Sequence, residues 1–225
     1  MATLQEFKTA LYGEGYDPSS FKVSRMVGTS LPTAFLKMPQ VHAVVKAYHQ
    51  DLSLPLEEFP LHESVELTLS YFLLFLTRLP TFESQMDFLS RKLPFAESWM
   101  ITDTLGMVLK KSQGTEFKPY YLAFTKSKAI YERRFAYVQA MRYYKEEKIT
   151  FFLDHLLFDE EYYVLMAEAW MLATFAITHF DEIAQFLQKK EIPLSLKRKA
   201  ISKMRDSYRI SPEEKEILKR IRDNG

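Results

Sequence analysis

"LTLSYFLLFLTRL", residues 67–79, is the most apolar run in the chain, and its length decides how the fold is interpreted. A run this short cannot span a bilayer, and an arginine stands near its end, so it predicts a buried helix. From about residue 57 onward apolar residues recur at helical spacing, and no segment alternates for long enough to predict a sheet. The sequence therefore predicts an all-α fold.

The composition is that of an ordinary globular protein, with 47% hydrophobic and 26% charged residues among 225. Cysteine is absent, which excludes disulfides and thiolate metal sites and favours a cytoplasmic location. The N-terminal stretch "MATLQEFKTALYGEG" lacks the pattern of a secretory signal. The net charge is only +1, so tight binding to duplex DNA would require an uneven placement of the 30 basic side chains.

Helix start signals recur along the chain. Thr81, Asp159, Ser195 and Ser211 each precede an apolar or amphipathic run. After Ser211, Pro212 occupies the first helical position and Glu214 can close a capping box. Long helices are predicted to begin near residues 64, 97, 129, 160 and 195, with a shorter helix in each interval. A two-helix unit repeating every ~31 to 35 residues predicts an α-solenoid, whose successive helices could form a concave face. An antiparallel helical bundle is the competing architecture.

The first 56 residues differ from the rest. A helix is predicted over residues 2–11, the Gly- and Pro-rich stretch 12–34 reads as loops and turns, and helix resumes after Pro39. We therefore expect one domain over residues 1–225, with an irregular part at 1–56 and regular helical repeats at 57–225.

Three helical segments carry the residues best suited to chemistry. In "WMITD", Trp99 and Asp103 are four residues apart and so share one helix face. Trp99, Arg134 and Trp170 are separated by 35 and 36 residues, close to the repeat length, so successive repeats could present them on one face. Spacing alone leaves the alternative open, because a helical tryptophan is usually a core residue with its N–H on a nearby acceptor.

Arg133 and Arg134 lie within "IYERRFAYV", residues 130–138, and such a pair is most often a surface ion pair, for which Glu132 is at hand. The five histidines are dispersed, and His155 with Asp159 is the best pair at helical spacing. With no Gly-rich phosphate loop and no cysteine nucleophile, we expect neither a metal nor a cofactor.

These motifs together resemble the DNA alkylation repair family, the AlkD-like HEAT-repeat DNA glycosylases, most clearly over residues 60–210. The family pattern of Trp, three residues and Asp appears as "WMITD", and the Ile-aromatic-x-x-Arg stretch as "IYERR". The second family tryptophan follows an acidic-aromatic start, here "DEEYYVLMAEAW", and a basic helix resembles "LSLKRKAISKM".

The resemblance implies excision of cationic alkylated purines, N3-methyladenine or N7-methylguanine, from duplex DNA without base flipping. Asp103 would stabilise the oxocarbenium-like transition state, Trp99 and Trp170 would attract the cationic nucleotide, and Arg134 would hold a phosphate. The expected partner is double-stranded DNA, bound by a monomer with no membrane or metal. The residues expected to contact the DNA backbone are Arg133, Lys197, Arg198, Lys199, Lys203 and Arg205. For the basic helix, a solvated capping repeat is the alternative.

The sequence departs from the family pattern near its N-terminus. The stretch 12–34 stands where active members have further helices that press on DNA, and His42 stands where the family's Pro-x-x-Arg element has its arginine. A second hypothesis follows: a divergent HEAT-repeat relative that binds DNA weakly, or binds a protein partner, and excises nothing.

Overall fold

The computed structural model describes residues 2–24 and 28–223. The described residues form twelve α-helices, several short 3-10 turns and one two-stranded ladder of two residues per strand, which confirms the predicted all-α class. The backbone contacts divide the chain into two compact units, Met1–Lys111 and Ser112–Gly225, and each is described by itself. Within the described residues, no helix is long and apolar enough to cross a membrane.

The first unit is built around α3, the helix predicted from the apolar run at 67–79. Eleven of its fourteen residues are buried, and Ser64 caps it by accepting the backbone N–H of Leu67. Strand β1 (Lys22–Val23) pairs antiparallel with β2 (Pro32–Thr33) in the region predicted to be loops. The helices of the unit are α1 (Leu4–Tyr12), α2 (Met38–Tyr48), α3 (Val65–Arg78), α4 (Phe82–Lys92) and α5 (Trp99–Thr104).

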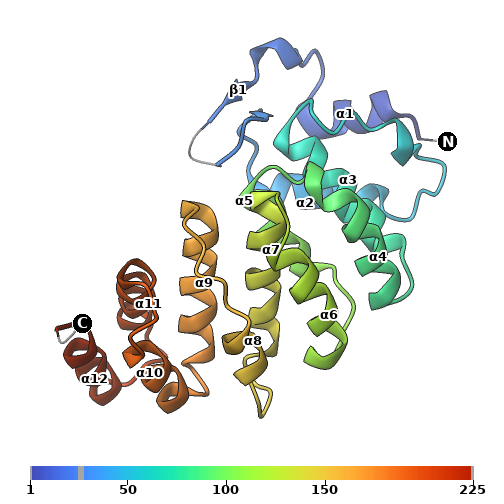
Figure 1. Cartoon of the computed structure of the whole chain (residues 1–225). Coiled ribbons are helices and arrows are strands. Elements are labelled where there is room, and N and C mark those ends of the chain that lie inside the picture. Colours follow the sequence, from blue (N-terminus) through green and yellow to red (C-terminus); the bar gives the residue numbers. More distant parts are fainter. Residues whose placement is uncertain (1, 25–27, 224–225) are drawn as a thin grey trace. The chain divides into compact units, whose positions relative to one another are not determined.

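The second unit is built around three long helices that pack side by side. Helix α7 contacts both α6 and α9, α9 contacts α11, and α11 contacts α12, so α7, α9 and α11 stand side by side (Figure 1). Helix α9 is apolar almost all round because neighbours cover it on two sides. The helices are α6 (Gly114–Thr125), α7 (Ile130–Ala140), α8 (Thr150–Asp154), α9 (Tyr162–Phe175), α10 (Phe180–Gln188), α11 (Leu194–Asp206) and α12 (Pro212–Asp223).

The predicted period of helix starts agrees with the structure, but the predicted lengths do not always. Helices α3, α5, α7, α9 and α11 begin at residues 65, 99, 130, 162 and 194. The expectation of a long helix near residue 97 was wrong, since α5 has six residues and passes into a 3-10 turn, Leu105–Met107, which contains Gly106. The shorter helix expected between residues 97 and 129 is α6, which has twelve residues and is longer than α5.

Two of the four predicted helix starts are confirmed and two are displaced. Thr81 and Ser211 accept N–H groups at the starts of α4 and α12, as predicted. The prediction for Ser195 was wrong, because α11 begins at Leu194, directly after Pro193. Asp159 does not cap α9 itself; its carboxylate accepts the N–H of Glu161, the residue before the helix.

Candidate functional site

Helix α5 presents Trp99 and Asp103 from a fixed position in the first unit. The buried Ser98 is its N-cap and accepts the N–H of Met100 at 3.1 Å, while Ile101 and Leu105 are fully buried. These contacts fix the rotation of a short helix that would be unstable alone. Trp99 and Asp103 are both half-buried and stand one turn apart. The predicted indole–carboxylate pair therefore lies on an anchored helix.

The hydroxyl of Thr102 gives Asp103 a polar neighbour, with its Oγ1 3.3 Å from the Oδ1 atom of the carboxylate. Thr102 itself is fully buried, so this contact comes from the side of the helix that faces the core. A carboxylate in this setting is oriented by the protein and still reaches the surface.

Arg134 lies on α7 in the second unit and is 7% exposed. Its Nη1 donates a hydrogen bond of 2.6 Å to the carbonyl oxygen of Tyr163, in the first turn of α9. The guanidinium therefore joins two neighbouring helices at the end where α9 begins. Its small exposed fraction limits any external contact to the edge of the group.

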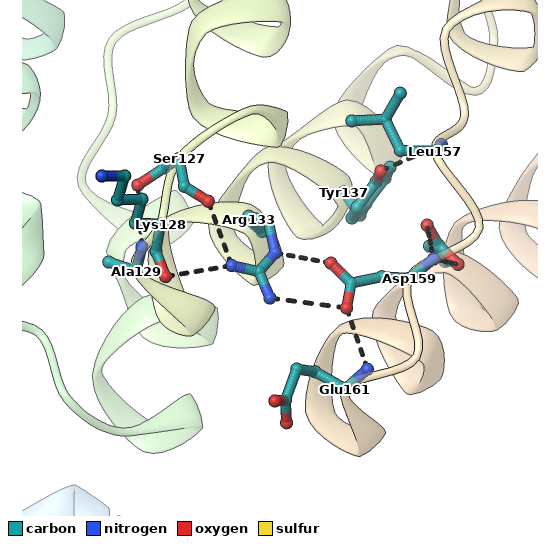
Figure 2. Close-up of polar contacts among 9 residues, drawn as sticks. Ser127, Lys128, Ala129, Arg133, Tyr137, Leu157, Asp159 and Glu161 are labelled. Atoms are coloured by element: carbon teal, nitrogen blue, oxygen red, sulfur yellow. Dashed lines mark hydrogen bonds and ion pairs between the residues drawn. The ribbon is translucent and has the colours of Figure 1, made fainter.

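Arg133, the adjacent residue, points to a different set of partners (Figure 2). Its Nε lies 2.5 Å from Oδ2 of Asp159, and its Nη2 lies 3.4 Å from Oδ1, while Nη1 donates to the carbonyl oxygens of Ser127 and Lys128. Asp159, rather than Glu132, is thus the carboxylate in its ion pair. This fork-shaped contact ties the start of α7 to the loop before α9.

Glu168 is a functional candidate that the sequence analysis missed. It is fully buried in α9, and both of its carboxylate oxygens accept the N–H of Asp159, at 3.1 and 3.2 Å. The hydroxyl of Tyr137 is a further partner, and burial raises the pKa of Glu168 to about 7. The signal in the sequence was an acidic residue in the middle of a helix that is otherwise apolar. Together Arg133, Asp159 and Glu168 hold the 155–161 loop, and with it the position of α9.

Trp170 is 42% exposed on α9, two residues after Glu168. The ammonium of Lys203 on α11 lies 5.8 Å from the centre of its ring, and that of Lys199 lies 5.9 Å from the ring of Tyr162. A groove of about 450 Å³ beside Trp170 includes Lys203 and the exposed Tyr208 and Arg209. Trp170 is therefore not a core residue, although a tryptophan in a helix usually is.

The basic side chains of the predicted C-terminal helix, α11, lie in different surroundings in the structure. Lys199 and Lys203 face the aromatic rings of α9, Lys197 is buried at 9% exposure, and Arg198 and Arg205 line a groove shared with α12. These five residues were predicted as one surface for DNA. The structure distributes them over three environments.

Comparison with known proteins places the chain in a family. Residues 22–204 match the model of the DNA alkylation repair enzyme family. The chain belongs to the DNA alkylation repair family. A search of curated proteins found no match.

The match includes Trp99, Asp103, Arg134 and Trp170, so all four candidate residues lie within the part of the chain that has the family pattern. Trp99 and Asp103 belong to the first unit, and Arg134 and Trp170 to the second. Within the second unit the contacts of α7 with α9 join Arg134 to the helix that carries Trp170. Over the described residues, no group of three or more His, Asp or Glu side chains is placed to hold a metal ion.

Proposed function

We propose that this DNA alkylation repair family protein hydrolyses the N-glycosidic bond of cationic alkylated purines in duplex DNA. The observation that carries the proposal is the pairing of Trp99 and Asp103, one turn apart on a helix whose rotation is fixed by a buried cap and core. N3-Methyladenine and N7-methylguanine are the expected lesions, released without base flipping.

The chemistry requires little acid catalysis, because an alkylated purine already carries a positive charge and leaves as a neutral base. As the bond from C1′ to the purine nitrogen breaks, positive charge moves onto the deoxyribose, and water then adds to C1′ and loses a proton. The carboxylate of Asp103 would stabilise that positive charge and position the water. Loss of such an electrostatic partner costs about 3 kcal/mol of barrier.

Trp99 and Trp170 would attract the cationic nucleotide through their ring faces, each by about 0.5 to 2 kcal/mol. The ammonium of Lys203 lies over the Trp170 ring, so a cationic lesion competes with an internal cation for that face. Arg134 would contact a phosphate with the exposed edge of its guanidinium. Arg133, Lys197, Lys199 and Lys203 remain proposed DNA-backbone contacts, beside Arg198 and Arg205.

For the architecture, we propose that residues 1–225 form a single α-solenoid of HEAT-like helix pairs whose concave face receives the duplex. The regular starts of α3, α5, α7, α9 and α11, and the packing of α7, α9 and α11 each on the next, support this arrangement. We also expect a monomer, and the lack of cysteine favours a reducing compartment such as the cytoplasm.

A second candidate function is a divergent family member that binds DNA weakly, or binds a protein partner, and excises nothing. The net charge of +1, the Gly- and Pro-rich stretch 12–34 and His42 in place of an arginine favour it. In that case Trp99 and Asp103 would be inherited without activity.

The test is release of free methylated purine from methylated duplex DNA by wild type, Asp103→Asn and Asp87→Asn. Asp87 is exposed on α4 of the same unit, so its variant makes the same charge change away from α5. Release by wild type and Asp87→Asn, but about 100-fold slower release by Asp103→Asn, would support the proposal. No release by folded wild type would support the divergent member, and equal release by all three would remove Asp103 from the mechanism.

A further inference from the structure

An aromatic groove lies in the first unit, between the end of α1, the turn that follows it and the segment at β2. Its volume is about 380 Å³, at the lower end of the range of roughly 300 to 1,000 Å³ that is usual for small-molecule sites. Its aromatic lining residues are Tyr12, Tyr16, Phe21 and Phe35, and its charged ones are Asp17 and Lys22. Trp99 and Asp103 do not line it, so the groove is separate from the residues proposed to act on the glycosidic bond.

Three of the four rings form one wall of the groove. Tyr12, at the end of α1, has its ring centre 4.9 Å from that of Tyr16 and 4.9 Å from that of Phe21. Its hydroxyl lies 2.7 Å from the hydroxyl of Ser64, the N-cap of α3, and forms a hydrogen bond with it. This wall is therefore anchored to the central helix of the unit.

Phe35, the fourth ring, is held in an unfavourable conformation. Its φ of 56° is left-handed, and its large apolar ring is 59% exposed. The buried Glu66 of α3 accepts the N–H groups of the residues on both sides of Phe35, which fixes this conformation. Among the described residues, the ring of Phe35 contacts no other aromatic ring, so its face is available to a ligand. Backbone strain and an exposed apolar ring both oppose folding, and strained residues are concentrated where proteins hold ligands.

The polar side chains that remain available in the groove can donate hydrogen bonds. The carboxylate of Asp17 is engaged within its own turn, where it accepts the N–H and the hydroxyl of Ser19. Within the described part of the chain, the exposed ammonium of Lys22 has no ion pair and the hydroxyl of Tyr16 has no hydrogen-bond partner. A ligand that contacts both groups must supply an acceptor, and a negatively charged acceptor makes the stronger hydrogen bond.

We propose that the aromatic groove binds a nucleotide, with the base between Phe35 and the wall that includes Tyr12 and the phosphate at Lys22. Every nucleobase has a flat face that stacks on aromatic side chains, and lysine is a common partner of phosphate. Aromatic rings beside an unpaired cation select a ligand that combines a planar ring with an anionic group. The nucleotide is either free or an unpaired unit of a strand. The inference is independent of the proposed excision, because binding a nucleotide breaks no bond.

The test measures binding of deoxyadenosine 5′-monophosphate (dAMP) to the full chain by saturation-transfer difference NMR, which detects weak ligands. Deoxyadenosine lacks the charge and deoxyribose 5-phosphate lacks the base, so these two compounds separate the two contributions. Phe35→Gly removes the ring at a position where glycine adopts positive φ without strain, and Phe35→Tyr keeps the ring. The matched control is Leu52→Gly, which removes another exposed apolar side chain of the same unit, outside the groove.

Phe35→Gly is expected to bind dAMP about 5- to 150-fold more weakly than wild type, because it loses a stacking partner of the base. Phe35→Tyr and Leu52→Gly should keep wild-type affinity. Lys22→Gln should weaken binding of dAMP about 2- to 5-fold and leave deoxyadenosine unchanged. Lys46→Gln, at an exposed lysine of the same unit outside the groove, should change neither.

Several outcomes would overturn the proposal. These are no binding of dAMP by folded wild type, equal weakening by Phe35→Gly and Leu52→Gly, equal affinity for dAMP and deoxyadenosine, and deoxyribose 5-phosphate that binds as tightly as dAMP. If Phe35→Gly unfolds by circular dichroism, Phe35→Leu is measured with the same expected weakening, since it loses the ring and keeps a side chain at this position.

A single-stranded octanucleotide of deoxyadenosine distinguishes the two sources of the nucleotide. Binding at least about 20-fold tighter than dAMP, with the gain lost in Phe35→Gly, would assign the groove to an unpaired nucleotide of a strand. Affinity equal to that of dAMP would assign it to a free nucleotide. Wild type that binds dAMP through the groove but releases no methylated purine would leave this inference standing and the proposed excision rejected.

Discussion

The buried carboxylate of Glu66 holds the backbone on both sides of Phe35. It accepts the N–H groups of Ala34 and Leu36, at 3.2 and 3.3 Å, and the hydroxyl of Thr33 at 2.6 Å. Between them Phe35 has a φ of 56° and a ring that is 59% exposed. A left-handed conformation costs an ordinary residue about 1 kcal/mol or more, so the hydrogen bonds to Glu66 offset local strain.

Removal of the Glu66 carboxylate should therefore release the segment at 33–36 from α3. Glu66→Ala is expected to lower the free energy of unfolding by about 3 kcal/mol, because it leaves a buried hydroxyl and two N–H groups without their acceptor. Phe35→Gly is the matched test of strain and should not lower stability, since glycine adopts positive φ freely and the lost ring is exposed. Urea unfolding of both variants measures the difference. A destabilised Phe35→Gly would show that the ring, not the backbone, carries the interaction.

Glu168 should make stability fall as pH rises. Its folded pKa of about 7 lies above the ordinary value of 4.5, so the folded state binds more protons than the unfolded state between those values. Stability from this group is fully present below about pH 4.5 and is lost as pH rises through about 7, by on the order of 3 kcal/mol. Glu168→Gln removes the titrating proton and should remove this part of the slope. Unfolding curves of wild type and variant from pH 5 to 8 should converge at low pH; parallel curves would contradict the assignment.

The Arg133–Asp159 ion pair should couple α7 to the loop before α9. Both side chains are largely buried, so a double-mutant cycle with Arg133→Met and Asp159→Asn is expected to give a coupling energy of about 1 to 2 kcal/mol. The same Arg133→Met variant also tests the predicted DNA contact. If Arg133 neutralises a phosphate, the salt dependence of duplex binding falls by about 0.9 in slope. A coupling energy near zero would show that the pair does not hold the loop.

Trp170 should contribute to lesion selectivity rather than to general affinity. Trp170→Leu is expected to reduce the preference for a duplex with a cationic alkylpurine over an undamaged duplex by about 2- to 30-fold, since it removes a cation–π contact of 0.5 to 2 kcal/mol. Binding to undamaged duplex is the internal control and should change little. Equal weakening for both duplexes would make Trp170 part of a general contact surface.

Many of the helices were predictable because local sequence specifies them. The apolar periodicity and the caps at Thr81 and Ser211 place elements correctly, and the interval between long helices agrees with the structure. The length of α5 was not predictable in the same way. Helical periodicity continues through residues 97–107, but Gly106 and the packing of Ile101 and Leu105 decide where the helix ends.

In the candidate site, too, the residues themselves were predictable from the sequence but their partners were not. Residue type and spacing singled out Trp99, Asp103, Arg134 and Trp170, since a shared helix face depends only on the 3.6-residue period. The partners of those residues depend on contacts distant in sequence. Glu168 accepts the N–H of Asp159, and Arg133 forms its ion pair with Asp159 rather than with the adjacent Glu132. Both contacts exist because folding brings α7 and the loop before α9 together.

The sequence by itself determined that the protein is all-α, where most helices begin and which family motifs it contains, because these follow from local periodicity and residue identity. Tertiary structure alone decided which charges are neutralised. It divided the basic residues of α11 between a buried position, two aromatic rings and the α11–α12 groove, and it enclosed Glu66 and Glu168. Desolvation and charge pairing depend on what surrounds a group in space, and neighbours in space are set by packing rather than by order along the chain.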